Sequence, residues 1–500
     1  MSLTRSTAEA QIRSAAARGA LSGILAACRA AVEACPDIAD FWFDLGYYLR
    51  QNEEPRAALD AYARALALGG AEPEMIHLNR AVILSDDLLD DTGAMAELTA
   101  ALDLRPDFAP ALMNLGNLHE ERGERREALA CYRRVLDQGP GAGPAHAGDA
   151  QARLLRLEAM EEGASGPAAR ALQAAFEGAG GAPAETRANL GFALGQVLER
   201  AGRIAPAFEA YTRANAIAAA AHPRYDRARA QANAQALIDA FPAARPAGVR
   251  DGEGGADLIF ICGLHRSGSS LAERVLSMHR NVAAFGELPF LQRLAARDLA
   301  PFPAGAGRLD AAGARAAAQR YRDRLAAMHA PRPGLRYTDK RPQNFLLIGL
   351  ILQLFPEAKI IHTVRDRRDV MVSIFGQHLD PRAAAYACDP GDIAHYMGLQ
   401  ARIMDHWRAL YPQAIFDLDY DAFVRAPDDT LAGLTGWLDL PAQDDLLDFH
   451  ARPGTVKTAS YWQVRSPVNT HSSGRWRAWA PHMGEAFAAL ARAGLVADRG

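Results

Sequence analysis

The sequence predicts an α + α/β chain, in which an all-helical repeat region precedes an α/β unit built on a parallel sheet. Residues 1–240 are rich in alanine and place leucine at three- and four-residue spacing, with few runs of β-forming residues. After residue 257, short apolar runs at 258–264, 359–364 and 415–419 alternate with stretches of helical periodicity. That alternation is typical of parallel strands covered by helices.

The helical half contains an internal repeat. Leu-Gly pairs end at Gly46, Gly116 and Gly195, and each glycine is followed by Ala twelve residues later and by Tyr sixteen residues later. Gly46 and Gly116 are 70 residues apart, which is two periods of 35 with room for a degenerate copy around residues 78–79. This period and order are typical of the tetratricopeptide repeat, although an ordinary helical bundle is the alternative. We expect a solenoid whose concave face holds a peptide or protein segment.

A segment rich in Pro and Gly separates the two halves. Residues 242–256 lack periodicity, as domain linkers commonly do. We therefore expect a helical repeat domain at 1–240, a linker at 241–257 and a second domain at 258–500. A chain of 500 residues exceeds what one hydrophobic core normally organises, which also favours two or more domains.

Composition narrows the function classes. The net charge of −4 argues against a dedicated nucleic-acid partner. The five cysteines are scattered and show neither a disulfide framework nor metal-ligand spacing. The first thirty residues lack a secretory apolar region, and no run of eighteen apolar residues occurs. We therefore expect a cytoplasmic protein with no metal and no membrane partner.

The first chemical motif is the segment LIFICGLHRSGSS at residues 258–270, which predicts a strand, a tight loop and a helix start. Unpaired N–H groups and the positive end of the helix dipole make such a loop a site for phosphate or sulfate. It lacks the Gly-Lys-Ser/Thr ending of a nucleotide P-loop, and alone it also fits a serine-capped turn. Positive charge, hydroxyl donors and flexibility come from five residues: Arg266, Ser267, Gly268, Ser269 and Ser270.

The second motif is a strand that ends in an arginine. Residues 359–364 predict a short buried strand, and Arg365 follows at its carboxyl end, where open α/β sheets bind their ligands. Ser373 lies eight residues further on and meets Arg365 only if the chain turns between them. The planar fork of arginine suits phosphate oxygens. The pattern is weak alone and becomes specific beside the first motif.

Together these segments resemble the sulfotransferases that use 3′-phosphoadenosine 5′-phosphosulfate. More narrowly, they resemble bacterial tetratricopeptide-repeat sulfotransferases, which are related to tyrosylprotein sulfotransferases. Animal tyrosylprotein sulfotransferases are membrane-anchored, and we expect this chain to differ from them on that point. The resemblance covers roughly the last half of the chain. It rests on the two motifs and on five further segments: GEL at 286–288, DKRPQN at 339–344, IGLILQLFP at 348–356, TASYWQVRSPVN at 458–469 and GRWR at 474–477.

The resemblance implies which residues hold the donor. Arg266 to Ser270 would grip the 5′-phosphosulfate, and Arg365 with Ser373 would grip the 3′-phosphate. Arg475 or Arg477 would add to that grip. Trp476 would either stack on adenine or belong to the core. Adenosine 3′,5′-bisphosphate would be the product, and no metal would be needed, because these demands are met by positioning and charge.

The resemblance also implies catalytic residues. Glu287 would be the base for the acceptor hydroxyl, Lys340 would steady the bridging oxygen, and Ser460 would support it. Arg266, which stands where positive charge is wanted, would also belong to the catalytic residues. Taken singly, Glu287 also fits a helix terminus, Lys340 a solvated surface charge and Ser460 a loop cap.

Three positions in or beside the loop depart from the family pattern. His265 stands where proline usually precedes the loop, and serines at 269 and 270 replace threonines. We do not expect His265 to be the base, because it precedes the loop rather than facing the acceptor.

The leading hypothesis is a sulfotransferase acting on tyrosine of a peptide or protein held by the repeats. One alternative is a sulfotransferase for a glycan, lipid or small alcohol. A second is a repeat scaffold carrying an inactive sulfotransferase fold. A P-loop kinase is disfavoured by the loop ending and by Arg365 and Ser373. The sequence leaves the oligomeric state open, with a homodimer as one alternative.

Overall fold

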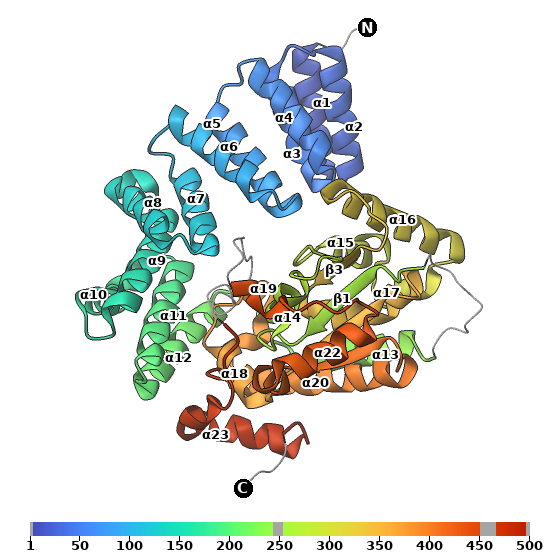
Figure 1. The fold of residues 1–500 in the computed structure, drawn as a ribbon. Helices are drawn as coiled ribbons and strands as arrows, with labels where there is room; N and C mark the ends of the chain where they lie inside the picture. The colour runs from blue at the N-terminus through green and yellow to red at the C-terminus, as the bar shows by residue number, and fades with distance from the viewer. Residues whose placement is uncertain (1–3, 244–253, 451–466, 497–500) are drawn as a thin grey trace. The chain divides into compact units, whose positions relative to one another are not determined.

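The structure, a computed structural model, describes residues 4–243, 254–450 and 467–496 (Figure 1). Tertiary contacts divide the chain into two compact units, Met1–Ala150 and Gln151–Gly500. The division falls inside helix α9 (Pro144–Glu162). It differs from the domain limits expected from the sequence. The expected linker at 241–257 lies largely outside the described residues, and a domain boundary there stays a prediction.

The first unit is a series of paired helices. Glycines of the sequence repeat pack against its tyrosines: a Cβ on Gly46 would lie 3.0 Å from the ring of Tyr62, and one on Gly116 would lie 2.6 Å from the ring of Tyr132. Glycine at these positions therefore permits the close helix approach that the repeat predicts. The helices are α1 (Arg5–Arg18), α2 (Leu21–Ala34), α3 (Ala39–Gln51), α4 (Pro55–Ala67), α5 (Pro73–Val82), α6 (Asp91–Leu104), α7 (Ala109–Arg122) and α8 (Arg125–Asp137).

The second unit begins with further helices of the same kind. These are α10 (Pro167–Gly178), α11 (Ala184–Arg200), α12 (Ile204–Ala220) and α13 (Arg227–Ala240). Within the α11–α12 hairpin, a Cβ on Gly195 would lie 2.3 Å from the ring of Tyr211. The Gly and Tyr contact therefore occurs in all three predicted repeats, and the tetratricopeptide-like architecture is confirmed.

A five-stranded parallel sheet forms the centre of the second unit, in the order β2-β3-β1-β4-β5. The three predicted strands are present as β1 (Leu258–Gly263), β4 (Lys359–Val364) and β5 (Ile415–Asp419). Two strands were not predicted, β2 (Val282–Ala284) and β3 (Arg336–Lys340). The α/β prediction is confirmed, and the sheet is two strands wider than expected.

Side chains alternate between the two faces of the sheet, as strand geometry requires. Ile259 and Ile261 pack with α14 (Ser269–Leu276) and α22 (Pro427–Trp437), whereas Phe260 stacks with Phe355 on the other face. Figure 1 shows the strands flanked by helices. The remaining helices are α15 (Phe290–Arg293), α16 (Ala311–Met328), α17 (Ile348–Leu354), α18 (Arg367–Phe375), α19 (Pro381–Ala384), α20 (Pro390–Leu410), α21 (Tyr420–Arg425) and α23 (Trp476–Arg492).

The α11–α12 hairpin shares one hydrophobic core with the α/β part. Tyr211 stacks on Trp479 of α23 with ring centroids 5.9 Å apart. Asn215 Nδ2 donates to the carbonyl oxygen of Phe375 at 2.9 Å, at the end of α18. The third repeat is therefore packed into the α/β unit by buried apolar and polar contacts.

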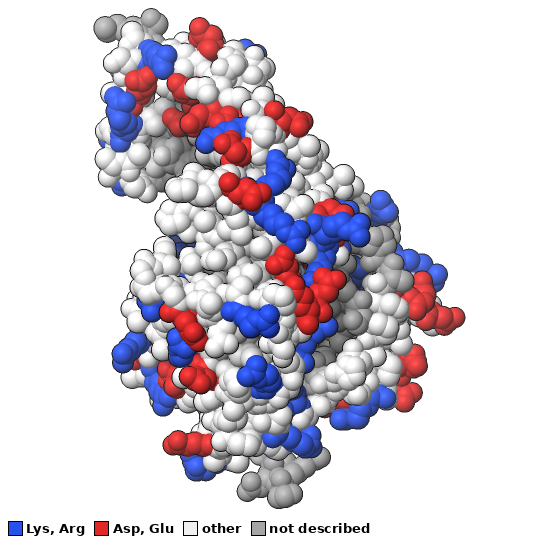
Figure 2. Space-filling model, turned by 90° about the vertical axis from the view of Figure 1, so that its left-hand side faces the viewer, with Lys and Arg blue, Asp and Glu red and all other residues white. Residues whose placement is uncertain are grey.

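Charged groups of both signs are intermixed over the face of the molecule in Figure 2. This agrees with the small net charge of −4. Among the described residues, no helix is long and apolar enough to cross a bilayer.

Candidate functional site

Among the described residues, several of the predicted site residues lie along the carboxyl edge of the sheet. From one side to the other, Glu287 follows β2, Lys340 ends β3, and the loop with Arg266 follows β1. Arg365 then follows β4, and Tyr420 follows β5. Chain connections run to opposite sides of β1, and ligands of open α/β sheets bind at such a switch point.

The loop after β1 has the backbone of an anion cradle. Arg266 has φ +69° and Gly268 has φ +107°, both in the left-handed region. Helix α14 then begins at Ser269, and the N–H groups of its first turn have no intrahelical acceptor. A Cβ on Gly268 would lie 2.6 Å from the ring of Tyr420, so only glycine lets the loop pack against α21. The predicted strand, loop and helix are confirmed.

The three serines of the loop differ in their surroundings. Ser267 is buried, its Oγ donates to the carbonyl oxygen of Leu264 at 2.7 Å, and it lies 2.7 Å from Thr363 Oγ1. Its backbone N–H also bonds Leu264. Ser267 therefore braces the loop against β4, and its direct contact with an anion stays a prediction. Ser269 and Ser270 begin α14, where their N–H groups face the open end of the helix.

Three guanidinium groups meet beside this loop. Arg266 Nε donates to Ser373 Oγ at 2.9 Å, and Arg365 Nη1 donates to the carbonyl oxygen of Arg266 at 3.2 Å. Burial, together with the charges of Arg475 and Arg365, lowers the pKa of Arg266 to about 10. Burial also lowers the pKa of Arg365. Ser373, in α18, therefore contacts Arg266 directly, and its place beside a 3′-phosphate held by Arg365 stays a prediction.

This cluster fits a bound anion. Among the described residues, the buried Nε–H groups of Arg365 and Arg475 have no hydrogen-bond acceptor. Buried donors are almost always paired in folded proteins, so two orphaned guanidinium donors in one cluster indicate a missing acceptor. Phosphate oxygens are the acceptors that arginine forks suit best.

The segment 472–476 contacts Arg365. Arg365 Nη2 donates to the carbonyl oxygen of Ser472, and Ser473 Oγ bonds Asp421. The N–H groups of Gly474 and Trp476 donate to Asp369 at 2.6 and 2.7 Å. Burial raises the pKa of Asp369, while these two bonds oppose the rise. The GRWR motif is thereby fixed to the start of α18.

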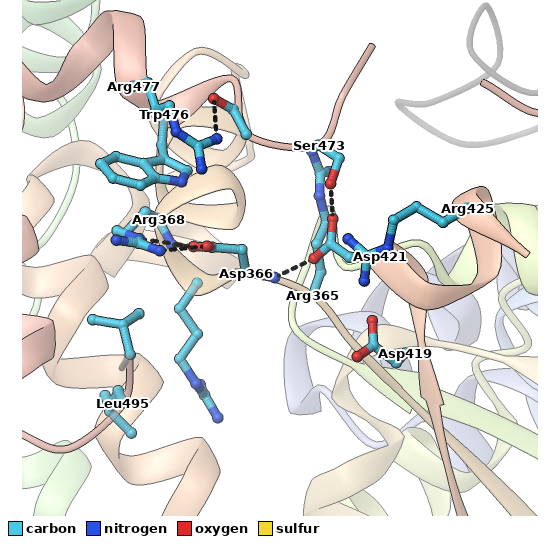
Figure 3. A pocket seen from close by; sticks show the side chains of 13 residues that line it. Arg365, Asp366, Arg368, Asp419, Asp421, Arg425, Ser473, Trp476, Arg477 and Leu495 are labelled. Carbon is cyan, nitrogen blue, oxygen red and sulfur yellow. Dashed lines mark hydrogen bonds and ion pairs between the residues drawn. The ribbon is translucent and has the colours of Figure 1, made fainter. Parts of the chain in front are cut away.

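A cavity of about 700 Å³ opens beside this segment (Figure 3). Trp476 lines it, with the guanidinium of Arg368 over its ring at 3.6 Å and that of Arg477 at 5.1 Å. Trp476 thus stacks on arginine in the described arrangement, and adenine stacking stays a prediction. Arg477 is exposed at the rim. Other lining residues include Arg365, Asp366, Asp419, Asp421 and Arg425.

Glu287 and Lys340 form an ion pair on the opposite side of the loop. Lys340 Nζ lies 2.8 Å from Glu287 Oε1, and the two side chains are 1% and 40% exposed. Glu273 holds the turn in front of Glu287 by accepting from the N–H of Gly286 at 2.9 Å. Burial raises the pKa of Glu273. The arrangement puts a buried cation behind a carboxylate that solvent can reach.

His265 is held away from solvent between two polar partners. Its Nδ1 lies 2.7 Å from the hydroxyl of Tyr386, and its Nε2 lies 3.0 Å from Gln343 Nε2. Burial lowers the pKa of His265 to about 4. A histidine that is neutral and engaged at both nitrogens suits a structural place in the loop. Ser460, the remaining predicted site residue, lies outside the described residues, and its role stays a prediction.

Sequence reasoning missed the aromatic and acidic residues that support the arginines. The ring of Tyr420 lies under the Arg365 guanidinium at 4.7 Å. Its place directly after the strand at 415–419 was a signal, because every parallel strand delivers the next residue to the same edge. Asp369 carried no such signal, because its partners lie more than 100 residues away.

Comparison with known proteins gives the class of the second unit. Residues 257–445 match the sulfotransferase family model, and residues 109–138 match a tetratricopeptide repeat model. The chain therefore carries a sulfotransferase-family domain together with a tetratricopeptide repeat.

The chain is also similar to individual proteins. A protein of Aquifex aeolicus (strain VF5) is 31% identical over 326 residues, which cover 60% of this chain and 41% of that protein. The chain thus spans about two fifths of that relative. A Caenorhabditis briggsae protein named "Putative protein-tyrosine sulfotransferase" is 25% identical over 235 residues, covering 44% of this chain and 80% of that one. The sulfotransferase domain from the Synechococcus PCC 7002 olefin synthase is 19% identical, with a TM-score of 0.34, covering 47% of this chain and 91% of that domain.

Proposed function

We propose that this protein transfers a sulfuryl group from 3′-phosphoadenosine 5′-phosphosulfate to the hydroxyl of a tyrosine in a peptide or protein. One observation carries the donor assignment. The three-arginine cluster has two orphaned buried Nε–H donors, and it lies beside a helix-start loop on the same sheet edge. Two neighbouring anion sites suit a donor that carries a 3′-phosphate and a 5′-phosphosulfate. The 3′-phosphate distinguishes this donor from ATP.

Different residues along the sheet edge would bind the donor and catalyse the transfer. Arg365, Ser373 and Arg475 would hold the 3′-phosphate, and the loop from Arg266 to Ser270 would hold the 5′ end. The bound donor supplies an activated sulfuryl group. In the transfer, the acceptor oxygen bonds to sulfur as the bond from sulfur to the 5′-phosphate oxygen breaks, and the proton of the acceptor passes to Glu287. Lys340 would face the negative charge on the departing phosphate.

The acceptor assignment rests on the Glu287 and Lys340 pair. A phenol has a pKa near 10, so at neutral pH it needs a base within hydrogen-bond reach. Glu287 is 40% exposed and held by a buried ammonium, so it presents a carboxylate to an incoming hydroxyl. The tetratricopeptide repeat supports a peptide or protein as the acceptor's carrier, because such repeats usually bind one. The name of the C. briggsae relative agrees.

Calorimetric titrations with adenosine 3′,5′-bisphosphate and with ATP test the donor assignment. We expect binding of the bisphosphate and at least tenfold weaker binding of ATP, because only the bisphosphate carries a 3′-phosphate. Binding of ATP alone would instead support a kinase. This test depends on no acceptor.

Mass spectrometry of an acceptor panel tests the acceptor class. The panel contains tyrosine peptides, matched peptides with phenylalanine, glycans, lipids and small alcohols, each incubated with the donor and enzyme. Sulfation confined to the tyrosine peptides is the expected result. Sulfation of a glycan, lipid or alcohol would replace the tyrosine assignment. Bisphosphate binding with no transfer to any acceptor would support a scaffold with an inactive fold.

A further inference from the structure

One carboxylate from the helical hairpin reaches the donor site. Glu199, near the end of α11, forms an ion pair with Arg475 at 3.1 Å between Oε1 and Nη2. The two side chains are 17% and 26% exposed. Glu199 lies outside every motif that predicted the site. It is also the ion-pair partner of a guanidinium whose Nε–H is orphaned among the described residues.

A tyrosine of the repeat holds the other oxygen of this carboxylate. The hydroxyl of Tyr211 donates to Glu199 Oε2 at 3.0 Å. Tyr211 is fully buried and packs against Gly195 of the same hairpin. The conformation of Glu199 is therefore set by the repeat, and Glu199 in turn sets the position of Arg475.

The preceding repeat contains an equivalent tyrosine–glutamate pair. Glu120 stands four residues after Gly116, as Glu199 stands four residues after Gly195. Tyr132 donates its hydroxyl to Glu120 Oε2 at 2.9 Å, and Glu120 is 1% exposed. A tyrosine–glutamate pair is thus an ordinary part of these two hairpins. In the third hairpin its second oxygen faces Arg475 of the donor site.

Charge explains why a carboxylate is needed at position 199. Arg266, Arg365 and Arg475 bring three positive charges together, and a phosphate monoester carries up to two negative charges. Glu199 is the carboxylate that pairs directly with Arg475, while Asp369 and Asp421 lie near Arg365. Arg475 can only donate, and a glutamine at position 199 could offer it an oxygen but no negative charge. The contact with Arg475 is an ion pair rather than a well-aligned hydrogen bond, so its strength depends on the charge.

We infer that Glu199 is a positioning residue, which holds Arg475 toward the donor's 3′-phosphate and makes the third repeat hairpin part of the donor site. This inference rests on the proposed function. Without Glu199, the repulsion from Arg266 and Arg365 would turn Arg475 toward solvent. The donor would then bind a site with two ordered arginines instead of three.

Calorimetric titration of Glu199→Gln tests this inference. We expect adenosine 3′,5′-bisphosphate to bind about tenfold more weakly than to the wild type, as expected for losing one charge-assisted contact. Adenosine 5′-monophosphate, which lacks the 3′-phosphate, should change by less than twofold. The matched control Glu120→Gln breaks the equivalent pair in the preceding repeat and should leave bisphosphate binding unchanged.

A double-mutant cycle separates positioning from a general structural effect. In an Arg475→Ala background, adding Glu199→Gln should change bisphosphate affinity by less than twofold. A tenfold loss that persists in that background would overturn the inference, as would unchanged or tighter binding by the single variant. If Glu199→Gln does not fold, Glu199→Asp replaces it in the same affinity measurement. Aspartate keeps the negative charge, but its shorter side chain does not extend as far toward Arg475. A wild-type protein that does not bind the bisphosphate would overturn the proposed function itself.

Discussion

The Glu287 and Lys340 pair makes an asymmetric prediction about stability and rate. Lys340 is 1% exposed, whereas Glu287 is 40% exposed. Removing Glu287 leaves a buried ammonium without its partner, which costs about 3 kcal/mol of unfolding free energy, at the low end of such changes because Glu273 lies nearby. Lys340→Met leaves a carboxylate that water can solvate, so its cost is about 1 kcal/mol or less.

Catalysis responds differently from stability. Glu287→Gln keeps an acceptor oxygen for Lys340 and removes the base, so the transfer rate falls by about 10²- to 10⁴-fold. The affinity for adenosine 3′,5′-bisphosphate should change by less than threefold, because Glu287 lies on the far side of the loop from the arginine cluster. Lys340→Met should also slow transfer, since it removes the cation that faces the leaving phosphate.

The assays are urea unfolding followed by tryptophan fluorescence and single-turnover transfer with a saturating donor. Trp407 and Trp479 are fully buried in the second unit and report on its unfolding. Equal stability losses for Glu287→Ala and Lys340→Met would refute the asymmetry. Full turnover by Glu287→Gln would remove Glu287 from the mechanism.

Three further predictions follow from local geometry. Gly268→Ala should weaken bisphosphate binding at least tenfold in calorimetry, because the new Cβ would lie 2.6 Å from Tyr420. The control Gly286→Ala, at φ +64° with nothing within 4 Å of the new Cβ, should leave binding unchanged. Equal effects of the two variants on binding would refute the steric argument. Gly195→Ala should lower the unfolding free energy by about 2 kcal/mol, because the new methyl group crowds Tyr211. The control Gly398→Ala, at a helical position with open space around it, should raise the unfolding free energy by about 0.5–1 kcal/mol. An unchanged unfolding free energy for Gly195→Ala would contradict the repeat packing. Burial lowers the pKa of His265 from 6.5 to about 4, so the unfolded chain binds more protons and unfolding free energy falls as pH drops from 6.5 to 4. The His265→Asn variant should lack that loss of about 3 kcal/mol. Burial raises the pKa of Asp339 to about 7, which gives the opposite pH dependence in both proteins, so the measurement is the difference between their urea midpoints at each pH. Parallel curves of urea midpoint against pH for the two proteins would refute the assignment to His265.

The sequence predicted the elements whose patterns are local. The strand at 258–263, the glycine-containing loop and the helix after it follow from apolar runs and turn residues within a dozen positions. The repeat helices follow from the spacing of Leu-Gly, Ala and Tyr. Strand β3 was missed because its Thr338 and Asp339 are polar yet buried. Distant residues make this possible: Glu273 accepts from Thr338, and Tyr321 donates to Asp339.

By itself, the sequence determined that a parallel sheet follows the helical repeats, and it predicted which residues at the sheet edge would hold an anion. Only the tertiary structure decided how they combine. Ser373 pairs with Arg266 rather than Arg365, Ser267 turns inward as a brace, and Glu199 reaches Arg475 from a helix 276 residues earlier in the chain. Sequence patterns report neighbours along a strand or helix, whereas these pairings arise where separate elements pack, and no local periodicity encodes such contacts.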